Sequence, residues 1–333
     1  MKLFKTLPIL FFALAWPCKN YAQPQQFNNP IAEQRADPWV HKEGDIYYLI
    51  ATVPEYDKIV IRSANSINGL KEAWEKTVWT KHAKGVMGHH IWAPELHKID
   101  GVWYIYFAAG EVEDVWKIRM WVLSNKSENP MEGKWKEEGQ IKTHHDSFSL
   151  DATTFEHNGK RYLIWAQNIF NTNHGTGLVL SEMESPTELT GPEVVITQPD
   201  FTWETMKYSV NEGPAVLKRN GKIFVTYSAS ATNHNYCVGL LWVDENADIL
   251  TASNWNKSPG PVFYTNTDLN RYGPGHNAFT TSEDGKNDIM IYHARDYKEI
   301  QGHELSDPNR ATRARVIKWT KSGFPDFMQN EGD

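Results

Sequence analysis

The sequence predicts an all-β protein, a single-domain five-bladed β-propeller, from a repeated strand, a repeated turn and the lack of helical periodicity. Five short aromatic or aliphatic runs each close on an alanine: Ala51, Ala108, Ala166, Ala229 and Ala294. These alanines are 57, 58, 63 and 65 residues apart, a spacing that accommodates a sheet of about four strands. No sustained 3.6-residue apolar pattern predicts helices.

Each run follows a Gly-containing turn, and an earlier strand precedes each turn. Four turns carry Asp-Gly or Asn-Gly, which favour hairpins because both turn positions need positive φ. The earlier strands are expected at residues 37–40, 94–98, 152–156, 214–218 and 276–281. The five units run from about residue 28 to 319 and leave no room for a second domain. A pair of β-sandwiches is the alternative, but its turns would come every 8–12 residues without the longer period.

The N-terminal residues 1–22 read as a secretory signal peptide. Two lysines precede an apolar run of about ten residues, too short to span a bilayer. We expect cleavage after Ala22. A lipoprotein signal at Cys18 is the alternative, which Trp16-Pro17 disfavours because such signals need small residues there. The propeller domain is then 23–333, exported to the periplasm or the cell exterior. It keeps only Cys237, so no intrachain disulfide can form.

The amino-acid composition limits the kinds of partner that the protein can bind. The chain has 34 Lys and Arg against 41 Asp and Glu, a net charge of −7, which disfavours nucleic acid because phosphate binding needs clustered cations. Loss of residues 1–22 removes three lysines and no acid, giving −10. No other apolar run reaches membrane length, so we expect no membrane span and a soluble monomer. Fourteen tryptophans suit a cleft for ligands with flat apolar faces, sugars among them.

The start of each repeat would line the central channel of a propeller. Three of the five starts carry a carboxylate: Asp37, Asp151 and Glu212. Three carboxylates at one small mouth repel each other, so at least one should hold its proton near neutral pH. One protonated acid and one ionised base are what hydrolysis of a glycosidic bond requires. The alternative is that each of them only caps a turn.

The same segments resemble glycoside hydrolase family 43 over about residues 29–327. The resemblance is carried by these motifs: Ala36-Asp37-Pro38, His90-Ile91-Trp92-Ala93-Pro94-Glu95, Ser149-Leu150-Asp151-Ala152-Thr153, Asn211-Glu212-Gly213-Pro214 and Gly273-Pro274-Gly275-His276-Asn277. Within the family, Val53–Asp57, Phe155–Gly159 and Tyr227–Thr232 are most similar to exo-acting α-L-arabinofuranosidases that trim arabinan. The resemblance implies a five-bladed propeller and a reaction that inverts the anomeric centre.

By this resemblance Asp37 is the general base, Glu212 the general acid, and Asp151 the residue that orients the acid and raises its pKa. An inverting enzyme keeps acid and base about 6.5–9.5 Å apart to admit a water, whereas a retaining one needs about 5 Å. Carboxylates on the first and fourth blades can face each other across a channel at the longer distance.

Further residues are candidates for binding the sugar. Trp92 and Trp39 could wall its pocket, with inter-blade packing as the alternative reading. Gln167 could hydrogen-bond sugar hydroxyls, and His90 adjoins the second-blade motif. Among the remaining histidines we expect mostly loop and surface residues.

His276 starts the fifth blade. The resemblance places a His on the channel axis, in some members beside a water-coordinated ion such as calcium. Hard cations prefer oxygen ligands, so His276 would act alone or hold a structural cation through water; no catalytic cofactor is expected. The resemblance also implies an Arg near the carboxylates, for which Arg313 is the candidate. Ala314-Arg315-Val316 departs from the subgroup, where a Gln is more usual, and leaves open which Arg points inward.

Three functions compete. The first is an exo-acting α-L-arabinofuranosidase that acts on arabinan or arabinoxylan oligosaccharides. The second is a β-xylosidase or an endo-arabinanase of the same family, and the loops 202–208 and 297–308 would decide between a blocked pocket and an open groove. The third is a propeller that binds polysaccharide without cleaving it. The three carboxylates argue against the third reading.

Overall fold

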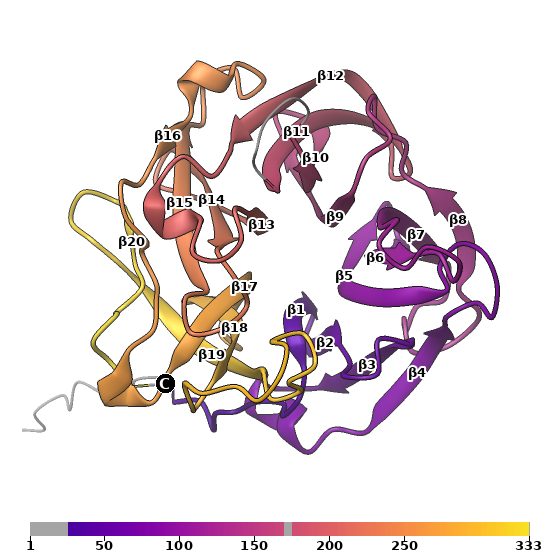
Figure 1. Ribbon diagram of the computed structural model, residues 1–333, viewed down its shortest axis with the longest axis horizontal. Helices are drawn as coiled ribbons and strands as arrows, with labels where there is room; N and C mark the ends of the chain where they lie inside the picture. The colour runs from indigo at the N-terminus through magenta and orange to yellow at the C-terminus, as the bar shows by residue number, and fades with distance from the viewer. Residues whose placement is uncertain (1–25, 170–174, 333) are drawn as a thin grey trace, which may run out of the picture.

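The computed structural model describes residues 26–169 and 175–332. They form five four-stranded antiparallel sheets, arranged as blades around a central channel (Figure 1). In every blade the strands follow one another in sequence order, with the first strand next to the channel. The predicted five-bladed propeller is confirmed and the sandwich alternative is wrong. The predicted signal peptide, with Cys18, lies outside the described residues.

The blades are consecutive in the chain. Blade 1 contains β1 (Ala36–Glu43), β2 (Ile46–Thr52), β3 (Lys58–Ala64) and β4 (Glu75–Thr80). Blade 2 contains β5 (His89–Ile99), β6 (Val102–Gly110), β7 (Arg119–Asn125) and β8 (Lys136–Gln140). Blade 3 contains β9 (Ser149–His157), β10 (Lys160–Asn168), β11 (Thr176–Ser185) and β12 (Glu188–Thr197). Blade 4 contains β13 (Asn211–Arg219), β14 (Lys222–Ala229), β15 (Cys237–Asp244) and β16 (Asn256–Lys257). Blade 5 contains β17 (Tyr272–Thr281), β18 (Asp288–Arg295), β19 (Ala311–Trp319) and β20 (Pro325–Asp326).

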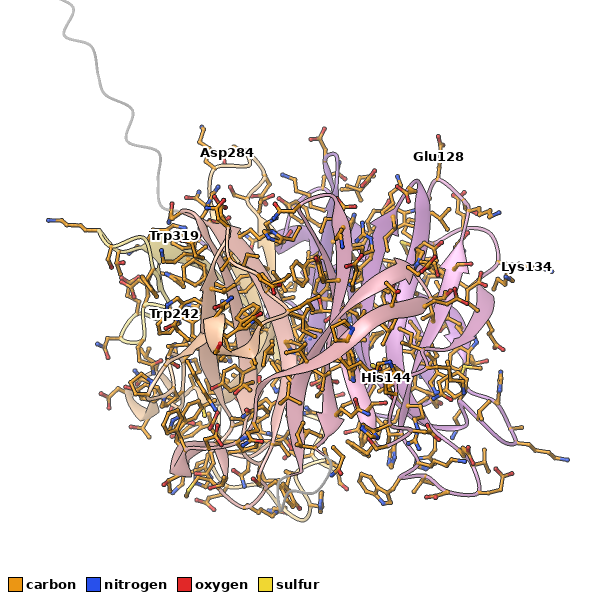
Figure 2. The ribbon with its side chains drawn as sticks, turned by 90° about the horizontal axis from the view of Figure 1, so that it is seen from above. Glu128, Lys134, His144, Trp242, Asp284 and Trp319 are labelled. Atoms are coloured by element: carbon orange, nitrogen blue, oxygen red, sulfur yellow. The ribbon has the colours of Figure 1, made fainter. Side chains whose placement is uncertain are left out.

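The helical elements of the described chain are short 3₁₀ turns: η1 (Asn68–Lys71), η2 (Thr202–Glu204), η3 (Ala252–Asn254) and η4 (Thr267–Leu269). The core lies between successive blades, where apolar faces meet. Ile59 and Ile61 of β3 belong to one cluster with Leu96 and Ile105 of the second blade. Trp242 and Trp319 pack against the cluster shared by blades 4 and 5, and lie on the same flank of the molecule (Figure 2). No blade could bury both faces alone.

An irregularity in pairing interrupts each inner strand near the channel mouth. At one irregularity in each strand a residue takes a left-handed φ: Asp37 (53°), Ala93 (43°), Asp151 (57°), Gly213 (54°) and His276 (41°). Strands β5 and β17 have a second irregularity, where His90 (51°) and Gly273 (58°) are left-handed. A bulge of this kind re-aims a side chain out of the ordinary alternation of a strand. For non-glycine residues it carries strain that typically marks functional sites. Asp37 and Asp151 occupy this position, whereas Glu212 precedes it by one residue, so the expected equivalence of the three carboxylates is not complete.

Backbone N–H groups at four of these bulges donate to a side chain of the preceding blade. Ala93 donates to Thr52 Oγ1 at 2.7 Å, and His276 donates to Ser228 Oγ at 2.7 Å. Asp37 donates to His293 Nδ1 at 3.0 Å. Gly213 donates to a carboxylate, Asp151 Oδ2, at 2.9 Å. These bonds satisfy donors that the interrupted ladder leaves free, and they tie the channel-lining residues of neighbouring blades together.

The ring is closed by the segment before β1. Ile31 N–H donates to the Thr312 carbonyl at 2.8 Å, and Thr312 N–H donates to the Ala32 carbonyl at 2.8 Å. The Asn29 side chain adds two bonds to the backbone of Ala314, each 2.9 Å long. The first described residues therefore pair with the last blade, which holds β1 beside β17.

Candidate active site

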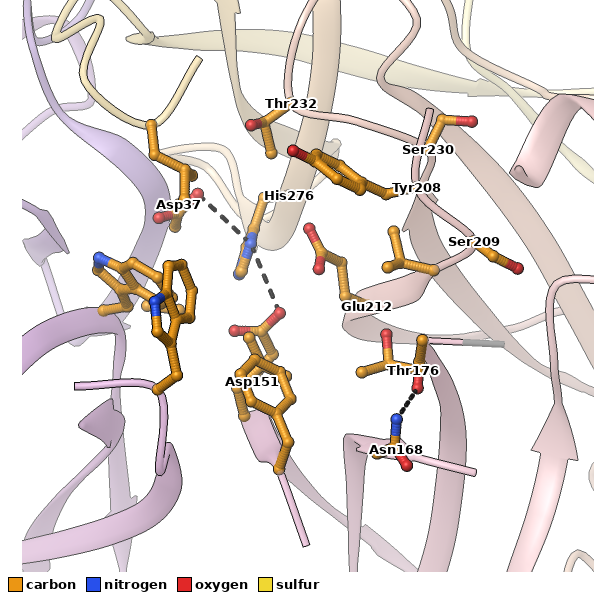
Figure 3. Close-up of a pocket in the computed structure, with 18 of the residues that line it drawn as sticks. Asp37, Asp151, Asn168, Thr176, Tyr208, Ser209, Glu212, Ser230, Thr232 and His276 are labelled. Carbon is orange, nitrogen blue, oxygen red and sulfur yellow. Dashed lines mark hydrogen bonds and ion pairs between the residues drawn. The ribbon is translucent and has the colours of Figure 1, made fainter. Parts of the chain in front are cut away.

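A pocket of about 580 Å³ opens at the mouth of the channel, within the range of small-ligand sites. Asp37, Asp151, Glu212 and His276 converge on it from four different blades (Figure 3). The three carboxylates singled out in the sequence therefore come together. These residues are far apart in the chain. The ring of blades brings their strands together, and the bulges direct their side chains into the channel mouth.

Asp37 lies beside the guanidinium of Arg310 and two imidazoles. Arg310 Nη1 donates to its Oδ1 at 3.1 Å, and His276 Nδ1 lies 3.5 Å from the same oxygen. His293 Nδ1 is 3.4 Å from Oδ1 and accepts the Asp37 N–H. Burial alone would raise the pKa of Asp37, but the charge of Arg310, followed by His276, outweighs it and holds that pKa well below its usual range. Asp37 is therefore ionised over the whole physiological range.

Glu212 lies in the opposite environment. It is partly exposed to the pocket, and Tyr236 donates its hydroxyl proton to Oε1 at 2.8 Å. Burial in the channel raises its pKa to about 7, with a contribution from the charge of Asp37, although the Tyr236 hydrogen bond opposes the shift. A carboxyl of this kind keeps a proton up to neutral pH.

Asp151 stands between the two. It is almost fully buried, and its Oδ2 accepts the Gly213 N–H while lying 3.9 Å from His276 Nδ1. Burial, then the charges of Glu212 and Asp37, raise its pKa. Because the Asp151–Glu212 pair shares this repulsion, ionising one of them keeps a proton on the other.

His276 contacts two of the carboxylates. Its Nδ1 faces both Asp37 and Asp151 (Figure 3), and its ring packs 3.1 Å from the position that a Cβ on Gly213 would take. Gly213 also has positive φ, so glycine is required there on both counts. Within residues 26–169 and 175–332, no group of three or more His, Cys, Asp or Glu is arranged to hold a metal ion. A structural cation beside His276 stays a prediction, and no step below uses one.

The apolar wall of the pocket comes mainly from blades 2 and 3. Trp92 lines it as expected, together with Trp116 and Phe148. Trp116 is 54% exposed, so a flat face is open to a ligand. His90 is not part of the lining; its ring stacks on Trp92 at 4.3 Å and lies 4.8 Å from the Trp116 ring. Its Nδ1 is 2.8 Å from the Val115 carbonyl, which makes His90 a support for both tryptophans.

Two expected sugar contacts are corrected by the structure. Trp39 does not line the pocket: its indole donates to the Leu96 carbonyl at 2.8 Å and packs 4.5 Å from the His97 ring, in the interface between blades 1 and 2. Gln167 is buried and its amide donates to the His145 carbonyl at 2.6 Å. Its neighbour Asn168 lines the pocket instead, because successive strand residues point to opposite faces.

The arginine at the carboxylates is Arg310, not Arg313. Arg310 is 5% exposed, lines the pocket and binds Asp37. Arg313 lies further along β19, opposite Tyr292. Sequence reasoning narrowed the choice to this segment, but it could not locate the start of the strand, on which the direction of each side chain depends.

Two loops close one side of the pocket. Tyr208 and Ser209 line it from the segment before β13, and His303 and Leu305 line it from the segment between β18 and β19. Lys207 Nζ joins the loops by donating to both Glu304 oxygens, at 2.8 and 2.7 Å.

The second loop has two further anchors. Tyr56 of the first blade donates to the Leu305 carbonyl at 2.5 Å. The buried Arg295 donates to Thr232 O, Glu304 O and Asp307 Oδ1 at 2.7, 3.0 and 3.0 Å. The loop between β18 and β19 is therefore held from blades 1, 4 and 5. Sequence reasoning missed Tyr236, Trp116 and Lys207, because no local pattern marks them.

Fold and site together define a class: a five-bladed propeller with a carboxylate pocket at its channel mouth, suited to acid–base cleavage of a glycosidic bond. The chain belongs to the glycosyl hydrolases family 43, whose family model matches residues 27–325. Among the described residues, no helix is long and apolar enough to cross a membrane.

The chain is similar to several characterised proteins. It is 55% identical over 302 residues to an extracellular exo-α-(1→5)-L-arabinofuranosidase of Streptomyces avermitilis, covering 90% of this chain and 63% of that one. It is 53% identical over 281 residues to a protein of the same description from Streptomyces chartreusis, covering 84% and 86% of the two chains. The crystal structure of an α-L-arabinofuranosidase from Lactobacillus brevis superposes with a TM-score of 0.90 at 44% identity, covering 93% and 98%.

Proposed function

We propose that this protein is an exo-acting α-L-arabinofuranosidase that releases terminal arabinofuranosyl residues from arabinan-type polysaccharides with inversion. The names of the similar proteins support the substrate class. The observation that supports this reaction most directly is the contrast between two carboxyls in one pocket. Arg310 keeps Asp37 ionised, and burial raises the pKa of Glu212 toward neutral pH. Such a pair separates base from acid.

In this proposal Glu212 donates its proton to the leaving glycosidic oxygen as the bond from that oxygen to the anomeric carbon breaks. Asp37 accepts a proton from a water, whose oxygen attacks the anomeric carbon from the opposite face. Arabinose with inverted configuration and a shortened glycan leave. Glu212 is then ionised and Asp37 protonated, and solvent restores both. The accumulating positive charge at the sugar is stabilised by the nearby carboxylates.

Asp151 supports the acid in two ways. When Asp151 is ionised, its charge disfavours ionisation of Glu212, because the two carboxyls are coupled. Its Oδ2 also accepts the N–H of Gly213, the residue that follows Glu212, and so holds the backbone from which the acid projects. Asp151 is in this scheme a positioning and pKa-raising residue.

Exo action is supported by the shape of the site. The two loops joined by Lys207 and Glu304 close the pocket beside Tyr208 and Leu305, so a terminal sugar can enter but a continuing chain cannot pass that side. The exposed Trp116 leaves an apolar face for the departing glycan. Stacking on an aromatic ring suits the apolar face of a sugar.

The test is to incubate the protein with linear arabinan, arabinoxylan and xylo-oligosaccharides, and to chromatograph products from the earliest times. Arabinose alone from the start supports the proposal, and the polymer most rapidly trimmed identifies the linkage. Proton NMR during the reaction reads the anomer first formed, which must be the inverted one. A ladder of arabino-oligosaccharides would indicate an endo-arabinanase, and xylose a β-xylosidase. Binding without any release would indicate a non-catalytic propeller.

The cellular setting is also proposed. The basic and apolar N-terminal segment and the extracellular relatives support export, to the periplasm or beyond it. A monomeric state stays a prediction, which sedimentation of the purified protein would test.

A further inference from the structure

Tyr236 is a buried tyrosine that the proposed roles leave unused. It is 1% exposed, and its hydroxyl is 2.8 Å from Glu212 Oε1. Its ring lies parallel to that of His293, with an interplanar angle of 2° and centroids 5.6 Å apart. A Cβ on Gly275 would come within 2.4 Å of the Tyr236 ring. A glycine and a neutral imidazole thus hold the phenol in one place.

The hydrogen bond between Tyr236 and Glu212 indicates which carboxyl oxygen carries the acid proton. The Tyr236 hydroxyl donates to Oε1 of Glu212 at 2.8 Å. A protonated carboxyl carries its proton on one oxygen and keeps the other as an acceptor. Because Oε1 accepts from Tyr236, Oε2 is the oxygen left to carry the proton.

We propose that Tyr236 is a positioning residue that keeps Oε1 of Glu212 occupied as an acceptor, so that the acid proton is carried by Oε2 and delivered to the glycosidic oxygen. The inference rests on the proposed function of Glu212 as general acid. It adds that the orientation of the proton is imposed by a residue outside the three carboxylates. Without the phenol, the proton could be on either oxygen and the carboxyl could rotate.

The same bond predicts a change in the pH profile. Donation from Tyr236 stabilises the ionised form of Glu212 and so lowers its pKa against the effect of burial. Removing the hydroxyl must therefore raise that pKa. The substitution leaves unchanged the other titratable and charged groups that act on Glu212 or contact its neighbours Asp37 and Asp151: Asp37, Asp151, Arg310 and His276.

The experiment compares Tyr236→Phe with Tyr47→Phe in the full chain. Tyr47 is also fully buried and its hydroxyl donates to the Thr281 carbonyl at 2.8 Å, so its variant loses a similar bond away from the site. Each variant is assayed with an arabino-oligosaccharide and with an aryl arabinofuranoside whose leaving group needs no proton. The measurements are kcat, KM, the pH dependence of kcat/KM, and thermal unfolding.

For Tyr236→Phe we expect kcat on the oligosaccharide to fall about ten- to hundred-fold, the usual effect of leaving a buried acceptor without its hydrogen bond. The aryl substrate should lose much less. The alkaline limb should move upward by about one pH unit, and Tyr47→Phe should change neither quantity.

An unchanged alkaline limb, or equal losses on both substrates, would overturn the positioning role. An equal shift of the alkaline limb in Tyr47→Phe would overturn the positioning role as well, because the effect would then come from a general loss of rigidity in the protein. Failure of the proposed function is distinguishable, because it would show as a wild-type protein that releases no arabinose.

Discussion

The two sides of the pocket hold the same functional group in contrasting surroundings. Around Asp37 the neighbours are a guanidinium and two imidazoles, with Arg310 Nη1 at 3.1 Å. Around Glu212 the hydrogen-bond partner is the neutral phenol of Tyr236 at 2.8 Å, and burial is the largest influence on the pKa of Glu212. Burial acts to raise the pKa of both carboxyls. The difference teaches that the sign of the local charge, rather than burial, separates an ionised carboxylate from a protonated one.

The largest effect is expected from Asp37→Asn, which replaces the ionised carboxylate of the pair with a neutral amide. An amide cannot take a proton from water, so activity should fall on the order of 10³-fold or more on every substrate. Initial rates on an arabino-oligosaccharide and on an aryl arabinofuranoside measure it. Retention of the aryl activity would remove Asp37 from the base role.

Glu212→Gln removes the protonated carboxyl of the pair. On an arabino-oligosaccharide the rate should fall on the order of 10²–10³-fold, because the leaving alkoxide then lacks a proton donor. An aryl substrate with a good leaving group should keep its rate within about ten-fold, and the alkaline limb near pH 7 should disappear. Equal loss on both substrates would show that Glu212 is not the acid.

Arg310→Gln changes the charge beside Asp37. Because the guanidinium favours the ionised carboxylate, its loss should raise the pKa of Asp37 by about 1–3 units. Asp37 acts as a base only when ionised, so the acidic limb of kcat/KM should move to higher pH and narrow the active range. Arg313→Gln, three residues away on β19, is the matched control. An unshifted limb in the first variant, or a shift in the second, would contradict the assignment.

The smallest effect is expected from Lys207→Ala, which leaves both carboxyls intact and releases the loop that closes the pocket. Lys207 is about half exposed, with a side-chain exposure of 47%, so its ion pair is worth little. We expect KM to rise about two- to five-fold with kcat nearly unchanged, and traces of oligosaccharide products. Lys298→Ala, which alters an exposed lysine in the same loop as Glu304, should change neither KM nor products.

The fold was predictable because its signals are local. Turn glycines and closing alanines recur in every blade, and each reports the conformation of its own few residues. The predicted inner strands all lie within β1, β5, β9, β13 and β17. The carboxylates were predictable for the same reason, since a position at the start of a repeat leads to the channel.

Side-chain direction was not predictable where strand pairing is irregular. Trp39 follows an irregularity in pairing and turns into the interface between blades, whereas Trp92 lies between two irregularities and faces the pocket. Gln167 and Asn168 show the same limitation, because a difference of one residue along β10 decides which of them lines the pocket. Arg310 was obscured by the unknown start of β19.

The sequence alone determined the architecture, the identity of the three carboxylates and the blades from which they come. These depend on periodicity and turn chemistry, which are properties of short segments. Only the tertiary structure decided which carboxyl is ionised and which is protonated. Arg310, Tyr236 and the Lys207–Glu304 pair reach the site from loops and strands remote in the chain. The pKa of a carboxyl depends on every charge and hydrogen bond within a few ångströms, and that distance is defined only when the ring of blades has closed.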